Sequence, residues 1–384
     1  MTTGHALSAE LLAAIQGRAG NPDRDAIEGV RRLSKLFTIE RDAMRETYLA
    51  DPLLRRSYLL YFLPVNLAKV AALLREMPAL PQRPLRILDV GSGPGAGALA
   101  VLEHLAQQTQ GGHEGSEVIA VDRSREALHE TECLWSVMST TRTGLPICAL
   151  RSVALDLERP VTHAPWKAGP YDLIILANSL NELFQTAADP VAGRVKLLEG
   201  LLDALASDGT LMVIEPALRG TTRALHQVRD RLVAAGRATV YSPCLHERPC
   251  PALVREDDWC HEERPWTPPA MVREIDRAVG FIKDALKFSY LLLRKDGLTI
   301  TERRPDVYRV VSEMLVMKGD QRAWLCNETG RPLVGRLDKA RSDANASFDL
   351  WHRGAIVRVD QIERCGTVGR IGNAARVEII RPVE

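Results

Sequence analysis

The middle of the chain alternates short apolar runs with amphipathic helical patterns, and this alternation constrains the fold more than any other feature. The apolar runs cover residues 87–90, 118–121, 152–155, 171–176 and 210–214. Helical patterns lie between or after them at 96–107, 124–138, 194–206 and 222–234. Short apolar strands separated by helices are typical of a parallel sheet covered on both faces. We therefore predict an α/β fold with a doubly wound sheet.

The segments on either side of this pattern predict further parts. Apolar residues recur at three- and four-residue spacing before the first strand, which indicates an N-terminal helical region over 1–80. A helix at 269–284 and strands at 288–294 and 307–317 are expected to complete the sheet, in a domain that covers 81–330.

The tail, 331–384, is punctuated by Gly and rich in β-branched residues. This composition is typical of a small C-terminal β-barrel.

Charge and composition limit the partners and the compartment. The chain of 384 residues has a formal net charge of +1, which excludes a strongly basic nucleic-acid coat. Residues 1–217 hold 21 Lys and Arg against 26 Asp and Glu, whereas 218–384 hold 29 against 23, so the second part is the more basic. Arg294, Lys295, Arg303 and Arg304 are candidates there for contacts with phosphate groups.

We expect a cytoplasmic monomer that does not enter a membrane. No apolar run of about 18 residues is evident, and the N-terminus lacks the pattern of a secretory signal. An odd number of cysteines, seven, fits a reducing compartment better than a disulfide framework.

A glycine-rich turn follows the first strand and opens a helix. Its sequence is Asp89-Val90-Gly91-Ser92-Gly93-Pro94-Gly95. Glycines at such a turn permit tight backbone conformations and let a ligand approach closely. Because nicotinamide enzymes have a similar turn, the glycines alone do not identify the ligand.

Polar side chains also follow the next three strands. Asp122 and Arg123 follow the second strand, Asp156 and Leu157 the third, and Asn178 the fourth. Because the carboxyl ends of parallel strands meet at one edge of a sheet, these residues are expected to lie around one ligand with the glycine-rich turn.

This arrangement resembles class I S-adenosylmethionine-dependent methyltransferases. In that family the loop cradles the methionine part of the methyl donor, and the acid after the second strand holds the ribose hydroxyls. The resemblance implies S-adenosylmethionine as cofactor. It implies a site formed by Asp89, Gly91, Ser92, Gly93, Pro94, Gly95, Asp122, Arg123, Asp156, Leu157 and Asn178.

The sequence does not assign a catalytic role to any residue. The Asn/Asp-Pro-Pro-aromatic stretch of amine methyltransferases is replaced after the fourth strand by residues 177–184, which contain no proline. No cysteine follows the fourth or fifth strand closely enough to attack a pyrimidine carbon. Asn178, Asn181 and Glu182 are weak candidates for orienting a substrate, and a helix N-terminus with its cap explains them equally well.

Four cysteines are candidate metal ligands: Cys244, Cys250, Cys260 and Cys326. The first three lie in a segment, 243–262, that is dense in Pro, His and charge, unlike the surroundings of core cysteines. Their spacing does not match the close pairs of structural zinc sites and fits an iron–sulfur cluster better, while zinc remains an alternative. His246 and His261 are near enough in sequence to be outer-shell groups or to replace Cys326. The other cysteines, Cys133, Cys148 and Cys365, have no partner spacing and are interpreted as core or surface thiols.

The donor loop and the cysteine segment together resemble the methyltransferase-like assembly factors of the small ribosomal subunit, known from mitochondria and with relatives in bacteria. The resemblance runs from about residue 30 to 340 and rests on Gly91–Gly95, on Asn178–Leu183, and on the cysteine segment. It implies a 4Fe-4S cluster on the four cysteines and binding to the small subunit and its rRNA. It also implies that methyl transfer is uncertain or lost.

Three functions are compatible with these observations. The first is a ribosome-assembly factor that binds the methyl donor. The second is an active rRNA methyltransferase. The third is a zinc-containing enzyme that methylates a small molecule.

Overall fold

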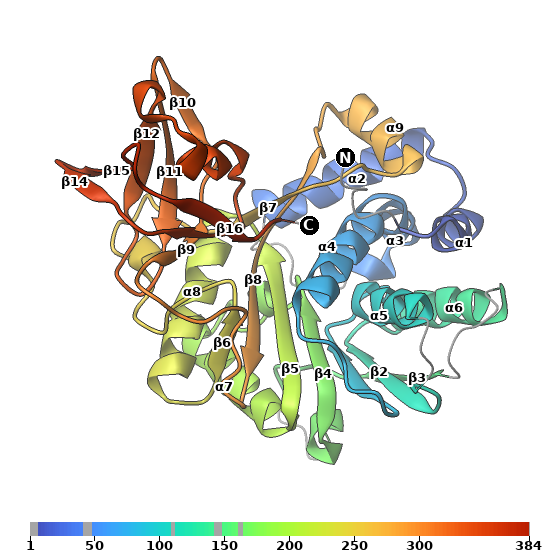
Figure 1. The fold of residues 1–384 in the computed structure, drawn as a ribbon. Coiled ribbons are helices and arrows are strands. Elements are labelled where there is room, and N and C mark those ends of the chain that lie inside the picture. Colours follow the sequence, from blue (N-terminus) through green and yellow to red (C-terminus); the bar gives the residue numbers. More distant parts are fainter. Residues whose placement is uncertain (1–6, 41–47, 109–111, 142–147, 160–163, 384) are drawn as a thin grey trace.

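The computed structural model describes residues 7–40, 48–108, 112–141, 148–159 and 164–383. Figure 1 shows a central sheet flanked by helices, with a second sheet forming a lobe beside it and the N-terminal helices on the other side. The central sheet confirms the predicted α/β fold of the class I methyltransferase type.

The central sheet has the order β3-β2-β1-β4-β5-β8-β6. Its parallel part is β1 (Arg86–Val90), β2 (Ser116–Asp122), β3 (Cys148–Ala154), β4 (Tyr171–Ala177) and β5 (Leu205–Pro216). The antiparallel strand β8 (Ala285–Arg294) then pairs with β5, β6 (Thr239–Ser242) and β7 (Glu262–Pro265). The strand order reverses between β1 and β4, which is where open α/β sheets bind ligands.

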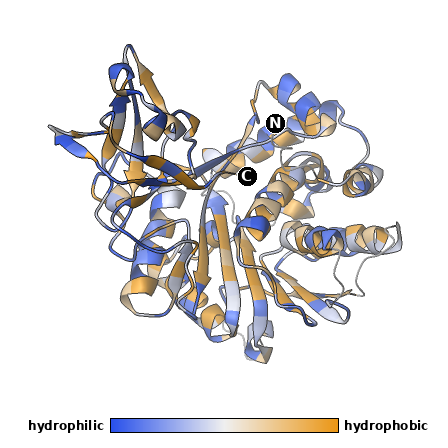
Figure 2. Ribbon diagram, in the orientation of Figure 1, coloured by the Kyte–Doolittle hydropathy of each residue, from blue (hydrophilic) through white to orange (hydrophobic). Residues whose placement is uncertain are grey.

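The two faces of this sheet are covered by different helices (Figure 1). Helices α4 (Leu63–Glu76), α5 (Ala96–Gln107) and α6 (Arg125–Thr141) lie on one face. Helices α7 (Pro190–Asp203) and α8 (Arg219–Ala234) lie on the other. Successive strand residues point to opposite faces, so Ile87 packs in the first core and Leu88 in the second. Figure 2 shows the resulting run of hydrophobic residues along the central strands.

The N-terminal region is helical where it is described, as predicted. It contains α1 (Ala9–Ala19), α2 (Arg24–Thr38), a 3-10 turn (Tyr48–Ala50), α3 (Pro52–Ser57), a π-helical turn (Tyr58–Phe62) and α4. Ser8 and Asp23 cap α1 and α2 by accepting backbone hydrogen bonds from Leu11 and Ala26. Residues 1–6 and 41–47 lie outside the described residues.

One helical stretch, Pro52–Glu76, is long and apolar enough to cross a membrane by length and composition alone. The expectation that the chain contains no such stretch is therefore wrong. Within the structure, 83% of its most apolar window is buried against the rest of the fold, so packing explains its composition. The core helix of a soluble protein passes the same test.

The second sheet has the order β14-β15-β12-β11-β9-β13-β16. Its strands are β9 (Val307–Val310), β11 (Asp320–Cys326), β12 (Leu333–Leu337), β13 (Ile356–Val359), β14 (Glu363–Cys365), β15 (Val368–Arg370) and β16 (Val377–Arg381), and β10 (Leu315–Met317) pairs with β11. The pairings among the described residues leave β14 and β16 at opposite ends, so the predicted closed barrel is not confirmed. The sheet has its own core around Phe348 and Trp351.

The expectation that strands at 307–317 complete the central sheet is wrong. β9 pairs with β11 and β13, and β10 pairs with β11, so all of this segment belongs to the second sheet. Strand partners are set by long-range pairing, which local composition does not encode. The second sheet thus begins inside the range 81–330 expected for the methyltransferase-like domain. Helix α9 (Ala270–Val279) is also shorter than its expected range 269–284.

A buried polar cluster joins the helical region to both sheets. Glu76, at the end of α4, forms ion pairs with Arg264 of β7 and, at 3.7 Å, with Arg309 of β9. Arg309 also pairs with Glu262 at 2.8 Å, and Tyr290 of β8 donates a hydrogen bond to Glu76. Burial alone raises the pKa of a carboxyl, but the charges of Arg264 and Arg309 hold the pKa of Glu76 well below its usual range. These five residues are called the Glu76 cluster below.

Substituting Glu76→Gln is expected to lower the free energy of unfolding by about 3–5 kcal/mol, because it leaves two buried guanidinium groups with one carboxylate. Urea denaturation followed by circular dichroism measures this. The control Asp257→Asn breaks an exposed ion pair with Arg255 and is expected to leave the midpoint unchanged. Equal midpoints for Glu76→Gln and the wild type would show that the cluster contributes little to stability.

Candidate functional site

The loop between β1 and α5 adopts a conformation that glycine allows. Gly91, Gly93 and Gly95 have φ of 67°, 52° and 89°, in the left-handed region. A Cβ on Gly91 would lie 2.4 Å from the Cβ of Ser179, whose hydroxyl donates a hydrogen bond to the carbonyl of Val90 at 3.0 Å. The loop is therefore held against the end of β4.

Asp89 connects this loop to the first turn of α5. Its carboxylate is fully buried and accepts a hydrogen bond from the Ala98 N–H at 2.8 Å, inside the first turn of α5. A Cβ on Gly97 would lie 2.6 Å from the same carboxylate. Burial, with a smaller contribution from the charge of Asp122, raises the pKa of Asp89 to about 7. Asp89 thus fixes the loop to the helix and is not among the residues that line the adjacent cavity.

Asp122 connects β2 to the same loop. Its carboxylate accepts hydrogen bonds from the N–H groups of Gly93 and Ser124, each at 2.8 Å. Burial raises the pKa of Asp122, while the two backbone donors act in the opposite direction. The carboxylate is therefore held at a fixed place at the mouth of the loop, with lone pairs left for other donors.

A cavity of about 80 Å³ opens at the carboxyl ends of β1 to β4. It brings together most of the residues predicted for the donor site: Gly91, Ser92, Gly93, Asp122, Arg123, Asp156, Leu157 and Asn178. Pro94 and Gly95 shape the loop but do not line the cavity. Tyr48 and Tyr58 also line it, and neither was predicted from the sequence to belong to the site. For Tyr58, the aromatic residues within 58–62 were the available signal in the sequence.

The three weak catalytic candidates lie beside this cavity. The Asn178 backbone has a φ of 59°, and its amide nitrogen and oxygen are buried without a hydrogen-bond partner in the described structure. Asn181 donates hydrogen bonds from its side chain to the Asn178 carbonyl at 3.0 Å and from its backbone to Glu215 at 3.2 Å. Glu182 accepts a hydrogen bond from the Tyr48 hydroxyl at 3.4 Å. A strained residue with an unpaired buried amide is typical of a binding site.

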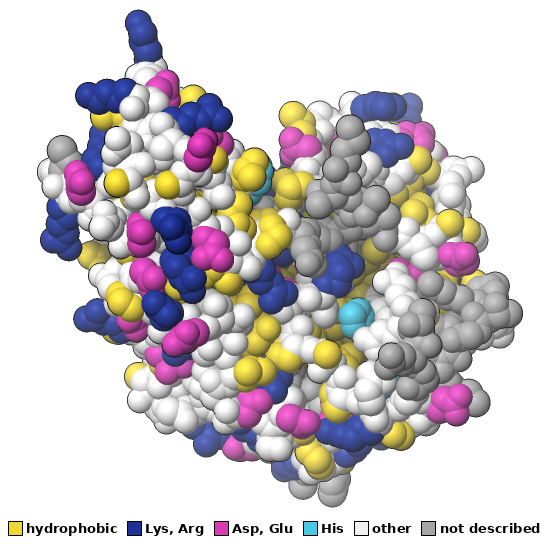
Figure 3. Space-filling model, in the orientation of Figure 1, with side chains coloured by type: hydrophobic (Ala, Val, Ile, Leu, Met, Phe, Trp, Pro, Cys, Tyr) yellow, Lys and Arg dark blue, Asp and Glu magenta, His cyan; other side chains and the backbone are white. Residues whose placement is uncertain are grey.

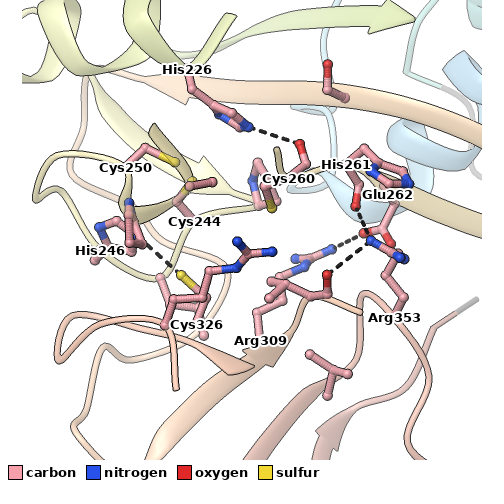
Figure 4. Close-up of a pocket in the computed structure, with 18 of the residues that line it drawn as sticks. His226, Cys244, His246, Cys250, Cys260, His261, Glu262, Arg309, Cys326 and Arg353 are labelled. Carbon is pink, nitrogen blue, oxygen red and sulfur yellow. Dashed lines mark hydrogen bonds and ion pairs between the residues drawn. The ribbon is translucent and has the colours of Figure 1, made fainter. Parts of the chain in front are cut away.

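The four candidate cysteines line a second cavity, between α8, the 243–262 segment and the second sheet (Figure 4). Its volume is about 40 Å³. Cys244, Cys250 and Cys260 come from the segment, and Cys326 comes from the end of β11. Figure 4 shows all four around the same space. The structure thus brings together four residues that lie up to 82 positions apart in sequence.

Histidines also lie at the cysteine cavity. His246 Nε2 lies 3.6 Å from Cys326 Sγ, and His226 contacts the Cys260 carbonyl at 3.0 Å. His261 lines the same cavity but pairs with Glu263 at 2.9 Å.

Two arginines of α8 hold the cysteine segment in place. Arg223 donates hydrogen bonds to the carbonyls of Ala252, Leu253, Arg255 and Asp258. Arg229 is fully buried and donates to the carbonyls of His246 and Arg248. These bonds satisfy backbone groups of a segment that has little regular structure. This role was not predicted from the sequence, although Arg223, His226 and Arg229 recur at three-residue spacing on one helix.

Burial disfavours the charged thiolate form of these cysteines. Burial raises the pKa of Cys260 to about 11. Burial, with the charges of the neighbouring cysteines, raises the pKa of Cys250 and Cys326 above the ordinary thiol range. Four converging thiols with few other donors match the ligand set of an iron–sulfur cluster, whose positive irons would favour the thiolates.

A single metal ion is a poorer match. Among the described residues, no three His, Cys, Asp or Glu side chains are close enough together to hold one ion. A tetrahedral zinc site needs its sulfurs about 2.3 Å from one centre. A cluster distributes its ligands over several irons and requires less close convergence. The structure therefore does not establish a metal centre, and the four cysteines as ligands stay a prediction.

Comparison with known proteins identifies the family. The family model described as mitochondrial small ribosomal subunit Rsm22 matches residues 54–337, about three quarters of the chain. The chain therefore belongs to this family. No curated protein matches it in sequence.

Solved structures that resemble the chain include several methyltransferases. Magnesium protoporphyrin IX methyltransferase from Synechocystis PCC 6803 with bound SAM has 13% identity and a TM-score of 0.34, over 71% of this chain and 99% of that one. The plantazolicin methyltransferase BpumL has 14% identity and a TM-score of 0.34, over 73% and 99%. TrmN from Thermus thermophilus has 22% identity and a TM-score of 0.28, over 41% and 42%. Sequence identities and TM-scores this low say nothing about the substrate or the cofactor of this chain.

The raised pKa of Asp89 predicts a pH dependence of stability. Between the pKa of an unfolded Asp, about 3.9, and about 7, the folded protein holds a proton that the unfolded chain releases, so stability falls as pH rises. Asp89→Asn is expected to reduce this slope by up to about 1.4 kcal/mol per pH unit. Urea denaturation at several pH values measures it, with the exposed Asp257→Asn as control. An unchanged slope in Asp89→Asn would contradict a protonated Asp89.

Proposed function

We propose that this member of the Rsm22 family binds S-adenosylmethionine and acts on the small ribosomal subunit and its rRNA as a methyltransferase-like assembly factor. The observation that carries the donor assignment is the cavity at the switch point of the central sheet. There the glycine-rich loop, Asp122 and Asp156 surround one space. A carboxylate fixed by the loop amides is suited to accept hydrogen bonds from vicinal hydroxyls of a ribose.

The small-subunit assignment rests on the family description. The charge distribution agrees with it, since Figure 3 shows Lys and Arg side chains gathered on the lobe formed by the second sheet, interspersed with acidic ones. Phosphate contacts from such a surface supply most of the non-specific affinity for RNA.

The four candidates for phosphate contacts differ in burial and in their partners. Arg294 is buried and pairs with Asp296, and Lys295 donates to the Leu205 carbonyl. Arg303 pairs with Glu247, and Arg304 with Asp306 at 3.1 Å. The buried Arg294 is therefore a poor candidate for binding RNA, whereas Lys295 and Arg304 are exposed and stay candidates.

A 4Fe-4S cluster is part of this proposal, with Cys244, Cys250, Cys260 and Cys326 as its ligands. When bound, it would tie the cysteine segment to β11 of the second sheet. The residues of this chain provide the surrounding frame, in which Arg229 holds the segment's carbonyls and the Cys250 N–H donates to Asp230 at 2.9 Å. A structural role agrees with the position of the cysteine cavity, which shares no lining residue with the donor cavity.

Active methylation of rRNA is the second candidate function. The unpaired amide of Asn178 between the donor cavity and a neighbouring cavity favours it. No observation favours a zinc-containing enzyme for small molecules.

Donor binding is tested by calorimetric titration of the full chain with S-adenosylhomocysteine. Asp122→Ala is expected to weaken binding by about tenfold or more, because it removes a hydrogen-bonded charge from the site. The control Glu114→Ala changes an exposed acid near the other end of β2 and is expected to bind as the wild type does. Absence of binding to the wild type, or equal affinity in Asp122→Ala, would contradict the donor site.

The cluster is tested by anaerobic purification with iron and sulfide assays and a visible spectrum. Iron and sulfide are expected in equal amounts, and Cys244→Ser or Cys326→Ser is expected to lose both, because each removes one of four ligands. Cys133→Ser is the control, since Cys133 is a free thiol of α6 outside the cysteine cavity. Stoichiometric zinc without iron would overturn the cluster.

A further inference from the structure

A larger cavity, of about 330 Å³, adjoins the donor cavity. The two share Tyr48, Tyr58, Asn178 and Glu182 as lining residues, so a ligand in one lies beside a ligand in the other. The larger cavity lies between the N-terminal helices and the ends of β4 and β5. Neither the family description nor the donor site assigns it a ligand.

Aromatic rings form one wall of this cavity. Phe37 lies edge-on to Tyr48 and Phe62, with ring centroids 5.2 Å and 5.1 Å away. Tyr58 and Phe62 are tilted by 31° at 5.6 Å. The Tyr58 hydroxyl is fixed by a hydrogen bond from Asn66 at 3.0 Å. A wall of ordered rings favours a flat aromatic ligand that can stack or pack edge-on.

Among the described residues, two lysines line the cavity without a direct carboxylate partner, and Glu182 lines it as well. Lys69 is buried, and its ammonium donates a hydrogen bond only to the neutral Asn66 amide, at 3.3 Å, among the bonds found in the described structure. Neither Lys69 nor Lys283 has a carboxylate within 4.0 Å in the described part of the chain, whereas Lys287 pairs with Glu263 at 2.9 Å. Burial, and then the charge of Lys283, lowers the pKa of Lys69 to about 7. Burying an unpaired ammonium is costly, and an anionic ligand would offset that cost.

Asn178 lies where the two cavities meet and can form hydrogen bonds with a ligand. The Asn178 side chain carries one acceptor and two donors, and none of them is used in the described structure. Its position at a strained backbone, with a φ of 59°, keeps the amide at this junction. An amide of this kind can pair with the polar edge of a heterocyclic base.

We infer that this cavity binds a nucleotide unit, with the base against the ring wall and Asn178, and the phosphate near Lys69 and Lys283. The inference rests on the proposed function and deepens it, because it places a single RNA nucleotide beside the methyl donor. A flat ring, a hydrogen-bonding edge and an anion are together the features of a nucleotide, and bases are read by stacking and edge contacts once they leave an RNA helix.

The test is calorimetric titration of the full chain, saturated with S-adenosylhomocysteine, with each of the four ribonucleoside 5′-monophosphates. At least one is expected to bind more tightly than its nucleoside and than inorganic phosphate. Lys69→Met and Lys283→Gln are expected to weaken that binding by about tenfold, because each removes a charge-assisted contact. Lys318→Gln, in the turn between β10 and β11 and outside the cavity, is the control and is expected to bind normally.

Lys69→Met also separates a binding role from a structural one. Replacing a buried, unpaired ammonium with an apolar chain of similar length is expected to raise the melting temperature while nucleotide affinity falls. Loss of stability and affinity together in both lysine variants would overturn the inference. So would unaltered nucleotide affinity in them, or no nucleotide binding by a wild-type chain that binds S-adenosylhomocysteine. Failure of the wild type to bind S-adenosylhomocysteine would instead overturn the proposed function.

Discussion

Three parts of the molecule meet at the buried Glu76 cluster. It joins the last turn of α4 to β7, β8 and β9, so one set of charges connects the helical region, the central sheet and the second sheet. Its carboxylates and guanidinium groups are desolvated and are stable only together. Removing one member leaves others unpaired, and the cluster therefore fixes how these three parts pack.

The cysteine cavity and the larger cavity are both lined by residues from elements that meet at this cluster. Arg309 of the cluster also lines the cysteine cavity and pairs in register with Cys326, so the fourth cysteine is placed by the same strand that carries the buried charge. Helix α4 also carries Lys69, which lines the larger cavity and lies two turns before Glu76. The proposed cluster site therefore shares no lining residue with the proposed donor and nucleotide sites.

Sequence predicted the parts that local pattern determines. The apolar runs predicted the central strands. The sequence Gly-Ser-Gly-Pro-Gly after the first strand predicted the loop, and Asp122 was expected beside it because strand ends converge at one edge of a sheet. The convergence of Cys326 with the other cysteines was also predicted, through family resemblance. The strand partners of β9, the arginines that hold the cysteine segment, and the ring wall near Tyr48 were not predicted. Each depends on contacts between residues far apart in the chain, which composition and periodicity do not specify.

The most direct measurement of the central claim is an experimental structure of the full chain soaked or co-crystallised with S-adenosylhomocysteine. We expect the ligand at the carboxyl ends of β1 to β4, with its ribose at Asp122, its methionine part against Gly91 to Gly93, and its sulfur facing Asn178. A ligand elsewhere, or an empty cavity at saturating concentration, would contradict it.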